Sequence, residues 1–277
     1  MNIARHFGDA SDCLKRFLTK VFGIARLGEG RHVEQKGSGI SRLFLEEAFE
    51  KQGCPICNLL RNSDIRTIDS LLYEFVNDVQ IRHEIRKTLG FCNYHSWILH
   101  EVATDLSLEC LSTTGAAVGI AIIYLDLVDT IAEKLKSAQS AKLTHRISLK
   151  EANHKTGDNT CRMCSSRSEN ESAYLQILLK SIGDRDFLAK YSVSDGLCAI
   201  HLQGFMMQEG FHQHKKALAA VEIRRLNTLS SDLREFLRKK DYRYAKEAPG
   251  KEADSWLRAL RKVSGERFAA PMKRPSR

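Results

Sequence analysis

Apolar residues recur at every third or fourth position over most of the chain after residue 40, a spacing that is typical of amphipathic helices. Neither half shows sustained alternation of apolar and polar residues, which would indicate strands. The pattern therefore predicts an all-α fold. The predicted helical segments are Ser41–Lys51, Ile65–Val79, about Ser107–Leu135, Glu169–Ile182, Asp184–Tyr191, a long helix through Leu218 and Leu237 that ends near Asp241, and Asp254–Val263.

The first 40 residues have a different pattern and are predicted to form an N-terminal extension. Ser11–Leu27 places apolar residues on one helical stripe and basic residues elsewhere, and Gly28–Gly39 is a polar, glycine-rich linker. A basic amphipathic helix can lie peripherally on an anionic membrane or dock on a partner. We favour a helix that packs on its own domain.

Two short motifs rich in cysteine are repeated along this helical pattern. Each copy contains a Cys-x-x-Cys motif followed by a Gly-(Phe/Leu)-Cys-x-x-His motif, with 34 or 33 residues between the second cysteine of the first motif and the cysteine of the second. Three thiolates and one imidazole are a typical ligand set for a bound metal. Six of the 8 cysteines fall in this register, so we predict two Cys3His metal sites. The predicted ligands are Cys54, Cys57, Cys92, His95, Cys161, Cys164, Cys198 and His201.

The local sequence around the motifs predicts how the ligands are held. Cys54 can cap a helix whose first residue is Pro55, so that the helix N-terminus faces the thiolates. Cys92 and His95 lie three residues apart, on one face of the next helix.

We also expect each site to be built within its own repeat, because an ancestral single unit had to bind its metal alone or as a symmetric dimer. The organisation expected is an extension at 1–40, one metal-binding helical repeat at 41–150, a second at 151–265 and a basic tail at 266–277.

Composition and charge place the chain among ordinary globular proteins. Its 277 residues are 43% hydrophobic and 28% charged, with a formal net charge of +9. The start lacks the features of a signal peptide, and the longest apolar run, Gly115–Leu125, is too short to cross a bilayer. Cysteines in metal-ligand spacing favour a reducing compartment, so we expect a cytoplasmic protein.

The ligand set predicts a metal without deciding its identity. Structural zinc is the leading interpretation, because four closed N/S ligands leave no position for a substrate. An iron–sulfur cluster is the alternative, since it also uses thiolates with occasional histidine. A thioredoxin-type redox site does not fit, because no βαβ pattern surrounds the cysteines.

The remaining cysteines, Cys13 and Cys110, lie outside the register of the motifs and are expected to be packing residues. His212 and His214 are expected to be surface histidines.

No catalytic constellation stands out, so we expect a non-enzymatic scaffold or interaction protein with two metal ions and an unidentified protein partner. An iron–sulfur redox protein or a cluster-dependent enzyme subunit is the opposing interpretation.

The segment from Ser231 to Arg277 holds 14 lysines and arginines against 7 aspartates and glutamates. With its aromatic residues Tyr242, Tyr244 and Trp256, this segment leaves nucleic-acid binding open.

The duplicated motifs resemble those of an uncharacterised prokaryotic family, a domain of unknown function. The stretches Lys240–Tyr244 and Asp254–Trp256 also resemble that family, and the similarity covers about residues 41–265. It implies the same eight ligand positions and no known activity. Arg162 departs from the proline of the first copy, and the N-terminal extension has no counterpart.

Overall fold

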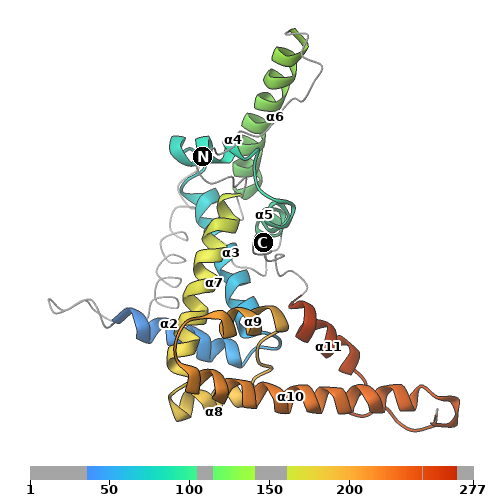
Figure 1. Cartoon of the computed structure of the whole chain (residues 1–277). Coiled ribbons are helices and arrows are strands. Elements are labelled where there is room, and N and C mark those ends of the chain that lie inside the picture. The colour runs from blue at the N-terminus through green and yellow to red at the C-terminus, as the bar shows by residue number, and fades with distance from the viewer. Residues whose placement is uncertain (1–35, 105–114, 141–160, 245, 267–277) are drawn as a thin grey trace, which may run out of the picture. The chain divides into compact units, whose positions relative to one another are not determined.

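The computed structural model describes residues 36–104, 115–140, 161–244 and 246–266, and every regular element in these ranges is helical. Contacts divide the chain into two compact units, Met1–Gly39 and Ile40–Arg277. The helices are α2 (Lys36–Phe49), α3 (Pro55–Tyr73), α4 (Val79–Lys87), α5 (Asn93–Thr104), α6 (Ala116–Ser140), α7 (Arg162–Ser181), α8 (Arg185–Val193), α9 (Ala199–Met207), α10 (His212–Lys239) and α11 (Ser255–Ser264), with a short 3-10 turn η2 (Tyr242–Tyr244) (Figure 1). The all-α prediction is confirmed.

Several predictions fall on residues outside this description. They are the amphipathic segment Ser11–Leu27, most of the glycine-rich linker, Cys13, Cys110 and the basic tail from residue 267. The helix predicted from about Ser107 is described from Ala116 and continues to Ser140.

The helix starts follow from the sequence. Cys54 caps α3 in an extended conformation, and Pro55 occupies the first turn, where its missing N–H removes no helical hydrogen bond. Cys161 and Cys198 cap α7 and α9 in the same extended conformation. Asp78 and Asp184 cap the two short helices α4 and α8, each accepting a backbone N–H at the helix start. None of the three cysteine side chains at helix caps makes a capping hydrogen bond, so these cysteines do not stabilise the helix starts in the way that Asp78 and Asp184 do.

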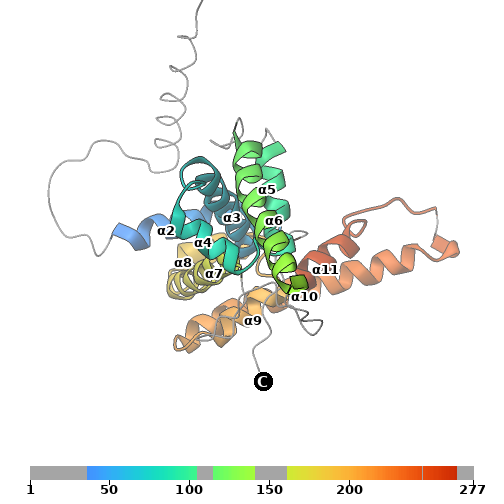
Figure 2. The same ribbon diagram turned by 90° about the horizontal axis from the view of Figure 1, so that it is seen from above.

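Helices α3 and α7 lie side by side and form the middle of the second unit (Figures 1 and 2). Hydrogen bonds between their central turns, such as that from Asn170 Nδ2 to Ser63 Oγ (2.8 Å), join the two repeats. The N-terminus of each helix lies at the far end of the other, as the cysteine groups described below show. The pair is therefore antiparallel.

Two hydrophobic cores pack against this helix pair, and each contains residues of both repeats. One core combines Leu45 and Ile56 of the first repeat with Phe187 and Phe205 of the second. The other consists mainly of residues from α3 to α6 and includes Met163 of α7. Burial of these side chains supplies the driving force that holds the repeats together.

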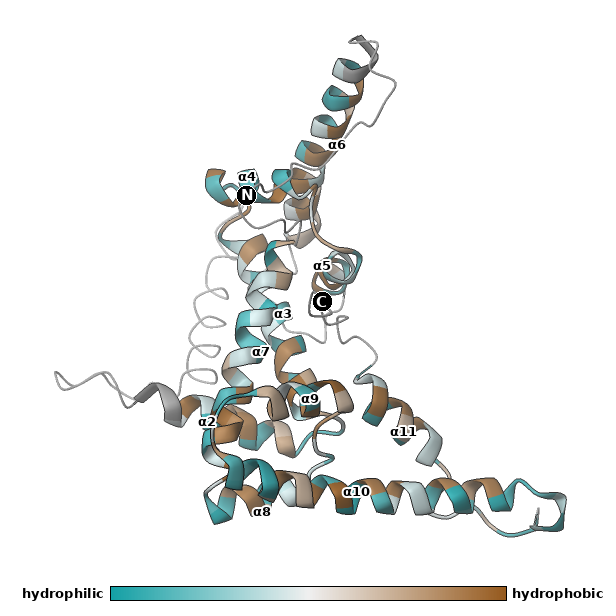
Figure 3. Ribbon diagram, in the orientation of Figure 1, coloured by the Kyte–Doolittle hydropathy of each residue, from teal (hydrophilic) through white to brown (hydrophobic). Residues whose placement is uncertain are grey.

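The distribution of polarity agrees with this packing. Figure 3 shows a largely hydrophobic α9 inside the second unit and a hydrophilic chain after α10. Within the described parts of the chain, no helix is long and apolar enough to cross a membrane.

Candidate metal centres

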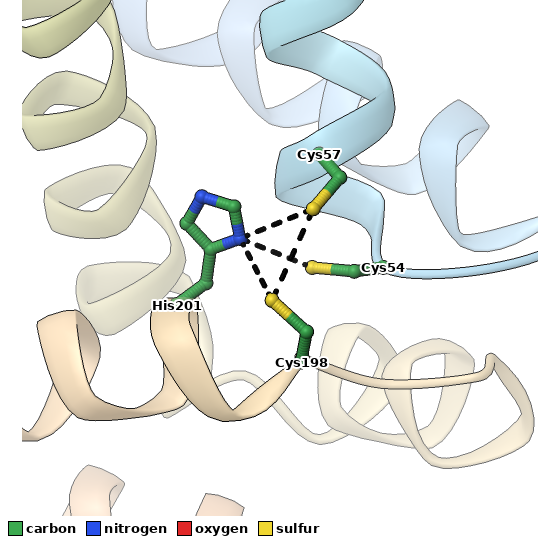
Figure 4. Close-up of side chains that lie close together, drawn as sticks. All are labelled: Cys54, Cys57, Cys198 and His201. Atoms are coloured by element: carbon green, nitrogen blue, oxygen red, sulfur yellow. Dashed lines mark hydrogen bonds between the residues drawn. The ribbon is translucent and has the colours of Figure 1, made fainter. Parts of the chain in front are cut away.

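The first cysteine group joins the starts of α3 and α9. Cys54 and Cys57 lie at the N-terminus of α3, and Cys198 and His201 at the N-terminus of α9 (Figure 4). His201 Nδ1 lies 3.4 Å from the sulfurs of both Cys54 and Cys57 and 3.2 Å from that of Cys198. The sulfurs of Cys57 and Cys198 are 3.9 Å apart. All four side chains are buried.

The second group has the same construction at the other end of the helix pair. Cys161 and Cys164 begin α7, and Cys92 and His95 lie at the start of α5. His95 Nδ1 lies 3.2 Å from the Cys92 sulfur, 3.5 Å from that of Cys161 and 3.4 Å from that of Cys164. The Cys164 sulfur is 3.5 Å from that of Cys92 and 3.3 Å from that of Cys161.

All eight predicted residues thus come together, but the prediction that each group forms within one repeat is wrong. Each group takes its Cys-x-x-Cys pair from one repeat and its Cys-x-x-His pair from the other. The reason is helix length. The 19 residues of α3 carry the chain about 28 Å away from Cys54, and the 9 residues of α4 are too short to bring it back. The start of the antiparallel α7 lies where α3 ends, so Cys161 and Cys164 complete the group there.

Helix N-termini supply the electrostatic environment of both groups. The free backbone N–H groups and the positive end of the helix dipole favour negative charge, and so favour thiolate over thiol. Burial acts in the opposite direction and raises the pKa of Cys54. Hydrogen bonds with the sulfurs of Cys54 and Cys57 lower the pKa of Cys198.

The side chains in contact with each histidine raise its pKa. Burial lowers the pKa of His95, but its contacts with Asp64, Cys161 and Cys92 outweigh burial and raise this pKa to about 11. Burial likewise lowers the pKa of His201, and the sulfurs of Cys198 and Cys57 raise it to about 10. Each group therefore attracts positive charge strongly, as a cation-binding site must.

A carboxylate lies near the Nε2 atom of each histidine, on the side of the ring that faces away from the sulfurs. The cysteine and histidine motifs alone did not predict this carboxylate. Asp64 Oδ1 is 3.5 Å from His95 Nε2, and Glu171 Oε1 is 3.6 Å from His201 Nε2. The Nδ1 atom of each ring faces the sulfurs while Nε2 faces the carboxylate. Histidine ligands of metals commonly have such a carboxylate partner, which fixes the tautomer and orients the ring. Both acids stand seven residues after the second cysteine of their own Cys-x-x-Cys motif, a signal that the sequence contained.

The two groups differ in their surroundings. Asp64 accepts hydrogen bonds from Arg167 and from the Tyr94 hydroxyl (3.1 Å). In the other copy of each motif, the residues that correspond to Arg167 and Tyr94 are the apolar Leu60 and Ile200. Cys92 and Cys164 are partly exposed, while every cysteine of the first group is buried. The second group is therefore more polar and more accessible.

Two other predicted residues lie outside both groups. His212 is exposed, as expected, but His214 is half-buried and its Nδ1 lies 2.8 Å from the carbonyl oxygen of Leu179. The surface assignment therefore holds for His212 alone, and neither histidine joins a candidate metal group.

Comparison with known proteins places this arrangement in a family. The model of a family of unknown function, DUF6062, matches residues 38–270. The chain belongs to DUF6062. It is also similar to an uncharacterized 23.9 kDa protein in the xynA 3' region of Caldicellulosiruptor sp. (strain Rt8B.4), with 26% identity over 203 residues that cover 71% of this chain and 87% of that protein. No solved structure matches. The DUF6062 match includes all eight cysteine and histidine residues of the two groups.

Proposed function

We propose that this DUF6062 protein binds two zinc ions and uses them to fasten its two repeats into a rigid helical scaffold for a protein partner. The observation that carries the proposal is the spacing of the ligand atoms. In both groups, the sulfur and Nδ1 atoms that are in contact lie 3.2–3.9 Å apart, and all four ligand atoms lie within 4.8 Å of one another.

A single tetrahedral ion accounts for these distances. With Zn–S bonds of about 2.3 Å and Zn–N bonds of about 2.0 Å, two sulfurs lie about 3.8 Å apart and a sulfur and a nitrogen about 3.5 Å apart. The residues that would hold the two ions are Cys54, Cys57, Cys198 and His201 in one group and Cys92, His95, Cys161 and Cys164 in the other. The donor set also fits zinc, because thiolate and imidazole are its usual ligands in structural sites.

The bound ions would serve folding rather than catalysis. Four protein ligands close the coordination shell, and a catalytic zinc needs an open position for water or substrate. Other parts of the chain orient the ligands and exclude water. Helix starts orient the sulfurs, Asp64 and Glu171 orient the imidazoles, and the two hydrophobic cores exclude water from most of each group.

An iron–sulfur centre is the second candidate, and the ligand spacing argues against it. In a cluster the ligands are divided among two or more irons, so ligand atoms on different irons must stand farther apart than around one ion. The ligand atoms of each group here all lie within 4.8 Å of one another. The same spacing leaves room for one ion in each group.

Metal analysis of the full chain, purified without oxygen, tests the proposal. We expect two zinc ions per chain, no iron, no acid-labile sulfide and no visible absorption. Iron with sulfide and a coloured protein would reject zinc in favour of the cluster. The same preparation of His95→Ala is expected to keep one zinc ion, because His201 belongs to the other group.

Further proposals concern partners and location. We propose a cytoplasmic location, because cysteines in metal-ligand spacing favour a reducing compartment, and a protein partner for the scaffold. Membrane contact through residues 11–27 stays a prediction. Nucleic-acid binding through the C-terminal basic residues gains no support from their contacts. Arg238 pairs with Glu235 and Glu247, and Lys239 with Glu252, so these cations already have carboxylate partners.

A further inference from the structure

A cavity beside the first cysteine group is lined by an unusual number of cations. It has a volume of about 490 Å³ and lies between α10 and α11, with Cys54 and Cys198 also in its wall. A volume of this size is typical of sites for small molecules. The charged residues that line it are Arg224, Arg225, Arg258, Arg261, Lys262 and Asp195.

Three of the cations have carboxylate partners that do not line the cavity. Glu222 pairs with Arg225 (2.7 Å) and Lys262 (2.5 Å), and Asp232 pairs with Arg258 (3.1 Å). Arg225 also donates to the carbonyl oxygen of Tyr191, and Arg258 to Asp254 and to the carbonyl oxygen of Lys251. Most donors of these side chains are therefore used, and the contacts mainly fix the direction of each side chain.

The other two cations are less satisfied. The only ion pair of Arg261 in the described chain is with Glu266 at 3.6 Å, which is too long for a hydrogen bond, and Arg224 has no ion pair there. Asp195, the one carboxylate in the wall, accepts a hydrogen bond from the backbone N–H of Gly53 (2.6 Å). Free donors and an excess of positive charge therefore face the cavity.

The orientation of α11 reinforces this inference. This helix is strongly amphipathic, yet its apolar side chains Trp256 (51% exposed) and Val263 (65% exposed) face outward. Its cations Arg258, Arg261 and Lys262 face the cavity instead and are half-buried. Removing cations from water is costly unless an anion compensates. Glu222 and Asp232 compensate Lys262 and Arg258, whereas Arg261 has only its 3.6 Å contact with Glu266, so an anionic occupant would compensate the charge that remains.

We propose that this cavity binds a small molecule that carries a phosphate or carboxylate group. Arginine matches both groups with paired N–H donors, and the hydroxyls of Ser192 and Thr228 add further hydrogen-bonding capacity. Val221 and Leu229 give the ligand a small apolar contact. The proposal does not depend on which metal the cysteine groups hold.

Calorimetric titration of the metal-loaded full chain tests the site. Inorganic phosphate and succinate serve as probes at constant ionic strength, because they represent the two sources of the charge, and metal content is measured before and after. We expect one binding site per chain for at least one probe. The probe that binds identifies a phosphate-bearing or a carboxylate-bearing ligand.

The variant Arg224→Gln with Arg261→Gln removes the two least satisfied cations, and we expect it to weaken binding roughly tenfold or more. The matched control Arg234→Gln with Lys240→Gln removes the same charge from exposed positions on and just after α10, outside the cavity, and is expected to bind as the unaltered protein does. Arg224→Gln alone, at an exposed position, gives the same test if the double variant does not fold. Absence of binding by both probes, or equal weakening in the cavity and control variants, would overturn the proposal.

Discussion

The pairing of cysteines across the repeats can be tested by removing two ligands at a time. The double variant Cys57→Ser with Cys198→Ser removes two ligands of the same group, so we expect it to keep one metal ion per chain. The double variant Cys57→Ser with Cys92→Ser damages both groups, so we expect it to keep none. If each group formed within one repeat, these two results would be exchanged.

The stability change follows from the length of chain that each metal closes. Cys57 and Cys198 are 141 residues apart, and closing a loop of that length reduces the entropy of the unfolded chain by an amount worth about 5 kcal/mol. Cys161 and His95 are 66 residues apart, which corresponds to about 4 kcal/mol. Since domains are stable by only about 5–15 kcal/mol, loss of either metal is expected to leave a marginally stable protein.

Native mass spectrometry counts the ions in each variant that folds, and urea unfolding then measures the loss of stability in the same variants. The control is Ser192→Ala, an exposed position outside both groups, which should keep both ions. One retained ion in Cys57→Ser with Cys92→Ser, together with none in Cys57→Ser with Cys198→Ser, would refute pairing across the repeats.

Three further predictions concern particular contacts. Asp64→Asn should weaken metal binding at the second group by about 10–100-fold, because the carboxylate orients His95, and competition with a chelator measures this while the first group serves as the internal control. Cys92 should be alkylated before Cys54 in a time course followed by peptide mass spectrometry, because Cys92 is partly exposed and Cys54 is buried; equal rates would contradict the burial difference. Gly196→Ala should destabilise the metal-loaded protein by about 2 kcal/mol or more in urea unfolding, since a methyl group at this residue (φ +70°) would lie 2.3 Å from the Glu222 carboxylate. Gly210→Ala, at φ +75° with no atom within 4 Å, should cost only about 1 kcal/mol, and an equal loss in both variants would show that the steric contact is unimportant.

The helices and the ligand residues could be predicted because both depend on local sequence. The capping of α3 by Cys54 follows from the proline after it, and the shared face of Cys92 and His95 follows from helical spacing. The pairing of the motifs depends instead on the direction in which α3 and α7 pack. Loop entropy does not decide it, because the cost of closing a loop rises only slowly with the loop's length. The carboxylates Asp64 and Glu171 could have been found by comparing the two copies position by position.

Exchange of ligands between the repeats changes what the metals stabilise. A group closed within one repeat would hold that repeat together and leave the contact between repeats to hydrophobic packing alone. Here each metal would tie the start of one long helix to the Cys-x-x-His helix of the other repeat, at opposite ends of the antiparallel pair. Separating the repeats would then require breaking both metal groups and exposing both mixed cores, Leu45 with Phe187 in one and Ile68 with Met163 in the other. With both ions bound, the duplicated halves would unfold as one cooperative unit, and loss of either ion would loosen the contact between the repeats.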